Sequence, residues 1–153
     1  MIDSSLINYI KKHSNSRTMD TIVIHCSATK EKKDYSIEDI KKWHLQRGFK
    51  DVGYHFVIKL DGTIEIGRPL DKIGAHVANH NNNTIGVCYI GGVSQEGENT
   101  DTRTAAQKVA LRKLLKDLSF KYHASIHGHN EYSNKDCPCF NAREEYKDIE
   151  WHK

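Results

Sequence analysis

The sequence predicts an α/β fold, in which a mixed central β-sheet is flanked by helices within a single domain. Strand-like and helical patterns alternate along the chain, two neighbouring strand-like runs are joined by a hairpin turn, and no linker or repeat divides the sequence. At 153 residues, the chain is long enough to bury one hydrophobic core and too short for two ordinary domains. Hydrophobic residues make up 37% of it and charged residues 28%, which argues against disorder and against membrane insertion.

The first elements are a buried strand and an amphipathic helix. The stretch TIVIHCS from Thr21 is short and rich in β-branched residues, which predicts a buried strand that ends near His25. Ser36 precedes IEDIKKWHLQRG, where apolar residues recur at helical spacing until Gly48. We expect a helix there, in which the His44 side chain either packs against neighbouring residues or lies at the surface.

A β-hairpin is predicted next. Asp61 and Gly62, a favoured hairpin turn, separate the two β-rich runs of VGYHFVIKLDGTIEIGRP. Because side chains alternate along a strand, Tyr54 is expected to share one face with Phe56 and Ile58.

The second half of the chain repeats the alternation. TIGVCYIGG from Thr84 predicts a buried strand that ends at a glycine pair. Thr104 and Gln107 form a capping-box pattern before KVALRKLLKDLSFKY, whose apolar stripe predicts a helix. A short strand at ASIHG and a last short helix near AREEYKDI complete the expected order. One antiparallel hairpin among interleaved strands and helices makes the sheet mixed.

Charge and cysteine content narrow the class of protein further. The formal net charge of +3 is a mild excess spread along the chain, which does not identify a nucleic-acid partner. The N-terminus MIDSSLINYIKKHSNSR lacks the continuous apolar centre of a secretion signal. We therefore expect a protein made in the cytoplasm without a signal peptide. Its four cysteines are expected to be free thiols or metal ligands rather than a disulfide framework.

Potential metal ligands gather in the stretch HGHNEYSNKDCPCF. His129 and Cys137 lie eight positions apart in a polar loop, and a catalytic zinc takes three protein ligands and leaves one position for water. His25, at the end of a buried strand, is the best candidate for the third ligand. His127 and Cys139 remain alternatives on spacing alone. The competing interpretation is a set of hydrogen-bonded histidines and buried thiols.

Four motifs together resemble a known family. IVIHCSATK, WHLQRGFKDVGYHFVIKLDGTIEIGR, NNNTIGVCYIGG and HNEYSNKDCP are similar to motifs of the zinc-dependent N-acetylmuramoyl-L-alanine amidases of type 2, especially the amidase-type lysozymes of bacteriophages. Peptidoglycan recognition proteins are more distant relatives with the same fold. The resemblance runs from about Thr21 to the last short helix. It implies an N-terminal segment at 1–20 and a zinc amidase domain at 21–153.

The resemblance also implies roles for individual residues. One zinc ion would be held by His25, His129 and Cys137. Tyr54 and Lys135 would be catalytic, with Lys135 as the cation beside the oxyanion and Tyr54 orienting water or passing a proton to the leaving amine. The substrate-binding candidates are His76 and Asn83.

The function implied is that of an endolysin. A zinc-activated water would hydrolyse the amide bond between N-acetylmuramic acid and L-alanine in peptidoglycan. We expect action on the cell wall after release or export, a monomer, no membrane insertion and no nucleic-acid partner. The alternatives are a non-catalytic peptidoglycan-binding module and an exported antibacterial amidase. Without a second, wall-anchoring domain, a thin wall is the expected target.

Overall fold

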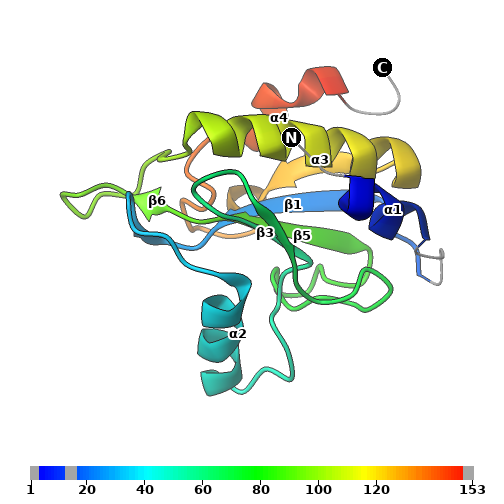
Figure 1. Ribbon diagram of the computed structural model, residues 1–153, viewed down its shortest axis with the longest axis horizontal. Coiled ribbons are helices and arrows are strands. Elements are labelled where there is room, and N and C mark those ends of the chain that lie inside the picture. Colours follow the sequence, from blue (N-terminus) through cyan, green and yellow to red (C-terminus); the bar gives the residue numbers. More distant parts are fainter. Residues whose placement is uncertain (1–3, 13–16, 150–153) are drawn as a thin grey trace.

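The computed structural model describes residues 4–12 and 17–149, and its centre is a five-stranded sheet in the order β4-β3-β5-β1-β7 (Figure 1). The strands are β1 (Thr21–Cys26), β3 (Phe56–Ile58), β4 (Ile64–Ile66), β5 (Thr84–Tyr89) and β7 (Ser125–Gly128). β1 runs parallel to both β5 and β7, β3 runs parallel to β5, and only the β3–β4 pair in this sheet is antiparallel. The mixed sheet predicted from the sequence is therefore confirmed. A separate parallel pair joins β2 (Thr29–Lys30) and β6 (Gly92–Val93).

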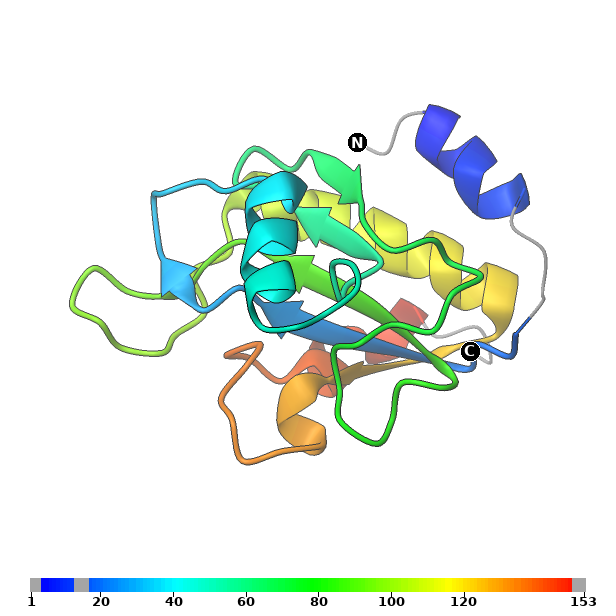
Figure 2. The same cartoon turned by 90° about the horizontal axis from the view of Figure 1, so that it is seen from below.

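Helices cover both faces of the sheet. The helical elements are α1 (Ser4–Lys12), α2 (Ile37–Gln46), α3 (Ala105–Tyr122), η1 (His129–Glu131), α4 (Ala142–Glu145) and η2 (Lys147–Ile149). α3 lies along one face, with α1 and α4 beside it, and α2 lies on the opposite face (Figures 1 and 2). None of the described helices is both long and apolar enough to cross a lipid bilayer.

Two hydrophobic clusters follow from this layering. The larger one fills the space between the sheet and α3, and it includes Phe56, Ile58, Leu111, Leu114 and Leu118. The smaller one lies under α2 and contains Ile40, Val52, Val57, Cys88 and Ile90. Alternate residues of the sheet thus enter opposite clusters, as a sheet covered on both faces requires.

Both long predicted helices begin where their capping residues indicate. The Ser36 hydroxyl accepts a hydrogen bond from the Asp39 backbone N–H, and the Thr104 hydroxyl accepts one from the Gln107 backbone N–H. The Gln107 side-chain amide also donates to the carbonyl oxygen of Ile58. The cap of α3 therefore fixes the helix to the sheet as well as starting it.

The hairpin is confirmed, but the predicted position of Tyr54 on it is wrong. Gly62 occupies the turn with φ of +89°, a conformation that favours glycine. Phe56 and Ile58 pack in the cluster under α3, whereas Tyr54 packs with Val57 in the cluster under α2. β3 begins at Phe56, and the alternation of side chains holds only for residues within a strand.

The N-terminal helix α1 packs against α3. Its Leu6 and Ile10 side chains are buried in the larger cluster, together with Met19. Isolated apolar residues in this part of the sequence are thus one stripe of a short amphipathic helix.

Candidate metal centre

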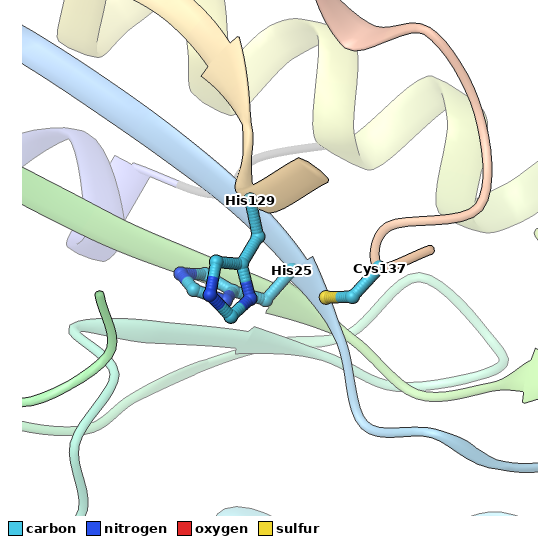
Figure 3. Close-up of side chains that lie close together, drawn as sticks. All are labelled: His25, His129 and Cys137. Atoms are coloured by element: carbon cyan, nitrogen blue, oxygen red, sulfur yellow. The ribbon is translucent and has the colours of Figure 1, made fainter. Parts of the chain in front are cut away.

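The three predicted ligands come together at one edge of the sheet (Figure 3). His25 is the penultimate residue of β1, and His129 begins η1 directly after β7. Because β1 and β7 are parallel neighbours, their carboxyl ends meet, as they do at the ligand sites of other open α/β sheets. The loop after η1 brings Cys137 to the same place. One ligand atom from each residue lies within 4.8 Å of the others.

Two hydrogen bonds hold Cys137 and the following residue, Pro138, in place. Its Sγ atom accepts a hydrogen bond of 3.1 Å from the Cys26 backbone N–H. The hydroxyl of Tyr89 donates a bond of 2.7 Å to the carbonyl oxygen of Pro138. All four cysteines are free thiols, so the sulfur is available as a ligand.

Both histidines are neutral at ordinary pH. Burial lowers the pKa of His25 well below its usual value, and the neighbouring His76, His129 and Lys135 lower it further. The pKa of His129 is lowered by burial and by the charge of Lys135. A neutral imidazole keeps a lone pair that can bind a metal ion. The site therefore presents two imidazole nitrogens and one sulfur.

The cluster opens into a cleft of about 510 Å³. Besides the three ligands, its lining includes His44, Arg47, Phe49, Tyr54, His76, Asn81 and Lys135. Most of these side chains come from the end of α2 and from the loops that precede β3 and β5. The lining thus places aromatic and cationic groups around the potential ligands.

Tyr54 and Lys135 both lie beside the cluster. The Tyr54 ring centroid is 5.1 Å from that of His25. Burial raises the pKa of Tyr54 well above its usual value, and nearby cysteine thiols raise it further. Its hydroxyl therefore stays protonated and can donate a hydrogen bond. Lys135 lies in the exposed loop before Cys137.

The two predicted substrate-binding residues are placed differently. His76 lines the cleft, and its Nδ1 atom is 2.8 Å from Nε2 of His25. Asn83 lies just before β5, where its side-chain amide donates to the carboxylate of Asp20 at 2.6 Å. It is not among the residues that line the cleft, whereas Asn81 is.

The two alternative ligands have other partners. His127 has one ring nitrogen 2.9 Å from the hydroxyl of Ser125 and the other 2.8 Å from a carboxylate oxygen of Glu131. The Cys139 thiol points to the carbonyl oxygen of Gly92 at 3.4 Å. Within the described residues, neither belongs to the cluster of potential ligands.

Sequence reasoning missed the contribution of α2. His44 was expected in packing or at the surface, yet it lines the cleft with only 6% of its surface exposed. Its Nδ1 atom accepts a 2.8 Å bond from the Gly53 backbone N–H, so the proton of the neutral ring is on Nε2. Helical spacing alone did not distinguish this residue from its packed neighbours.

The chain is similar in sequence and in structure to several known proteins. Residues 15–140 match the family model for N-acetylmuramoyl-L-alanine amidase. The endolysin of Escherichia phage T7 is 42% identical over 125 residues, which cover 81% of this chain and 83% of that protein. The solved structure of the N-acetylmuramoyl-L-alanine amidase LysC from Clostridium intestinale superposes with a TM-score of 0.74 at 30% identity, covering 88% and 86% of the two chains. Wild-type PGRP-LB from Drosophila superposes with a TM-score of 0.71 at 25% identity, covering 88% and 83%.

Proposed function

The chain belongs to the N-acetylmuramoyl-L-alanine amidase family, and we propose that it works as a zinc-dependent endolysin. Its reaction is hydrolysis of the amide bond that joins N-acetylmuramic acid to L-alanine in peptidoglycan. The observation that carries the zinc assignment is the cluster of His25, His129 and Cys137 beside an open cleft.

The chemistry of the three donors fits zinc. Two imidazole nitrogens and one thiolate are ligands that zinc prefers, and three protein ligands are the usual number at a catalytic site. Neutral histidines suit this role because a protonated ring cannot bind a cation. The backbone N–H of Cys26 donates a hydrogen bond to the Cys137 sulfur and so helps to hold it at the site. When bound, zinc supplies Lewis acidity that activates water and polarises the amide carbonyl.

Lys135 is the residue proposed to stabilise the developing negative charge. Hydrolysis of an amide places charge on the carbonyl oxygen, and a nearby cation lowers the energy of that state. Lys135 lines the cleft two positions before Cys137. No hydrogen bond or ion pair occupies its Nζ atom among the described residues, so its amine is available to substrate.

Tyr54 is proposed to orient water or to transfer a proton to the leaving amine. Its hydroxyl remains protonated because burial raises its pKa, and its ring lies against His25. It can therefore donate a hydrogen bond to water, to the carbonyl oxygen or to the leaving amine.

The biological role follows the family and its phage members. Such an enzyme acts on the cell wall, with peptidoglycan as its substrate. We propose that it does so as a monomer, made in the cytoplasm and without a nucleic-acid partner. The presence of Cys137, Tyr54 and Lys135 in one cleft favours catalysis over a module that only binds peptidoglycan.

Digestion of purified peptidoglycan tests the function. Mass spectrometry of the products should find stem peptides with a free L-alanine amine. A chelator should stop their release, and added zinc should restore it. Cleaved glycan strands, or no products at all, would contradict the amidase. Release that is insensitive to the chelator would contradict only the role of zinc.

A further inference from the structure

A chain of hydrogen bonds links the start of β5 to the potential metal ligand on β1. Nε2 of His25 is 2.8 Å from Nδ1 of His76. Nε2 of His76 is 3.1 Å from the hydroxyl oxygen of Thr84. That hydroxyl in turn lies 2.9 Å from the carbonyl oxygen of His80. These hydrogen bonds therefore connect the His80 carbonyl, through the Thr84 hydroxyl and the His76 ring, to the ring of His25.

Only one arrangement of protons satisfies all of these bonds. A carbonyl oxygen can only accept, so the single hydrogen of the Thr84 hydroxyl is donated to His80. The Thr84 oxygen is then free to accept a hydrogen from Nε2 of His76. Because a neutral imidazole carries one N–H, Nδ1 of His76 must accept the hydrogen on Nε2 of His25. His25 is left with its lone pair on Nδ1.

The alternative acceptor for Thr84 leads to the same result. The carbonyl oxygen of Asn81 lies 3.4 Å from the Thr84 hydroxyl. This carbonyl oxygen can also only accept a hydrogen. The direction of the hydrogen bonds from His25 to His76 and Thr84 is therefore the same whichever carbonyl accepts the Thr84 hydrogen.

The ring of His76 is held in place by its surroundings. Its backbone N–H and that of Val77 both donate to the side-chain oxygen of Asn81 at 3.0 Å. The ring also packs so closely on the backbone of Gly86 that a Cβ atom there would lie 2.7 Å from its Cγ atom. A glycine at this position in β5 is needed to admit the ring.

We propose that His76 is a positioning residue for the metal ligand His25. Through Thr84 it fixes the proton of His25 on Nε2 and so presents Nδ1 to the ion. The proposal rests on the proposed function, because it takes His25 as a zinc ligand. It gives His76 a role that does not require contact with substrate. Partners of this kind typically change metal affinity by about 10–100-fold when they are removed.

Substitution of Thr84 tests the proposal away from both the ligands and the cleft lining. Thr84→Val removes the hydroxyl but keeps the shape of the side chain, and Thr84→Ser keeps the hydroxyl. Competition with a chromogenic chelator would measure the zinc dissociation constant of each purified variant. We expect about a tenfold or greater weakening in Thr84→Val and recovery towards the wild-type value in Thr84→Ser. Equal zinc affinity in all three proteins would overturn the proposal.

A second measurement keeps the test valid if Thr84→Val folds poorly. Long-range proton–nitrogen NMR of the metal-free wild-type protein reports which ring nitrogen carries the hydrogen. We expect it on Nε2 in both His25 and His76. A hydrogen on Nδ1 of either ring would overturn the proposal.

A pair of His76 variants adds a direct comparison. His76→Asn keeps an acceptor near the position of Nδ1, whereas His76→Leu removes it, so zinc should bind more tightly to the asparagine variant. Equal affinity in the two folded variants would count against the role of the acceptor. If the wild-type protein itself bound no zinc, the proposed function would fail. Normal zinc binding with no effect of these substitutions would reject only the role of His76.

Discussion

The backbone N–H of Cys26 donates a hydrogen bond to the Sγ atom of Cys137 at 3.1 Å. Cys26 directly follows His25 in β1, so one strand both carries a potential ligand and positions another. The end of β1 thus helps to fix the geometry of the site.

Replacement of Cys137 by alanine should abolish zinc binding and hydrolysis together. The variant keeps two imidazole ligands, too few for a stable catalytic site. Metal content after dialysis and release of stem peptides would measure the two effects. Cys139→Ala is the matched control, since its thiol bonds to the Gly92 carbonyl and should leave the metal in place. Full activity of metal-free Cys137→Ala would reject the assignment.

Replacement of Lys135 by alanine should lower kcat without loss of the metal. Removing a group that stabilises an oxyanion typically costs about 100-fold or more in turnover. Steady-state kinetics with a soluble muropeptide would measure the change, and metal analysis would check the site. Lys50→Ala, an exposed lysine outside the cleft, should behave as wild type. Unchanged turnover in Lys135→Ala would return this lysine to a simple surface charge.

Tyr54→Phe should also lower kcat, by about 100-fold if its hydroxyl acts in proton transfer. The ring and its packing near His25 are retained, so stability and zinc affinity should change little. Burial raises the pKa of Tyr54 above the ordinary tyrosine value of about 10. Ionisation of Tyr54 should therefore cause no fall in the wild-type rate as the pH rises to about 10. Tyr35→Phe, outside the cleft lining, is the control. Equal rates in the two variants would contradict a catalytic hydroxyl.

Local sequence signals predicted the elements that depend on neighbours in the chain, whereas the set of three ligands came from the family resemblance. β-branched runs marked β1 and β5, and capping residues marked α2 and α3. The ends of parallel strands then brought His25 and His129 together. Such features follow from short-range chemistry and the rules of strand pairing.

Features that depend on tertiary packing were not predicted. His76 meets His25 only because the loop before β5 folds back over Gly86, and no spacing in the sequence encodes that contact. Tyr54 lies on the opposite side of the sheet from the predicted one because β3 begins two residues later than the alternating pattern suggests. The α1 helix was missed because its few apolar residues become a stripe only against α3.

Acid should destabilise the metal-free fold through His55. This side chain is fully buried, and its Nδ1 atom accepts a hydrogen bond from the Gly86 backbone N–H while Nε2 donates to the Lys72 carbonyl. Burial lowers its pKa to about 4, the hydrogen bond to the Lys72 carbonyl opposes this shift, and the charges of Arg17 and Arg68 add to it. In the unfolded chain the pKa of histidine is about 6.5. The stability from neutral His55 is therefore complete above about pH 6.5 and is lost as the pH falls towards 4.

Urea denaturation with a chelator present, at intervals from pH 7 to pH 4.5, would measure this effect. His55 should contribute about 3 kcal/mol to the pH-dependent loss in free energy of unfolding across its full titration. His55→Asn removes the titrating ring, so near pH 5 its stability should depend on pH less steeply than that of wild type, by about 1.4 kcal/mol per pH unit. His123→Asn provides the same substitution at an exposed left-handed position that suits asparagine, and should keep the wild-type slope. Equal slopes for His55→Asn and wild type would show that His55 does not link folding to protonation.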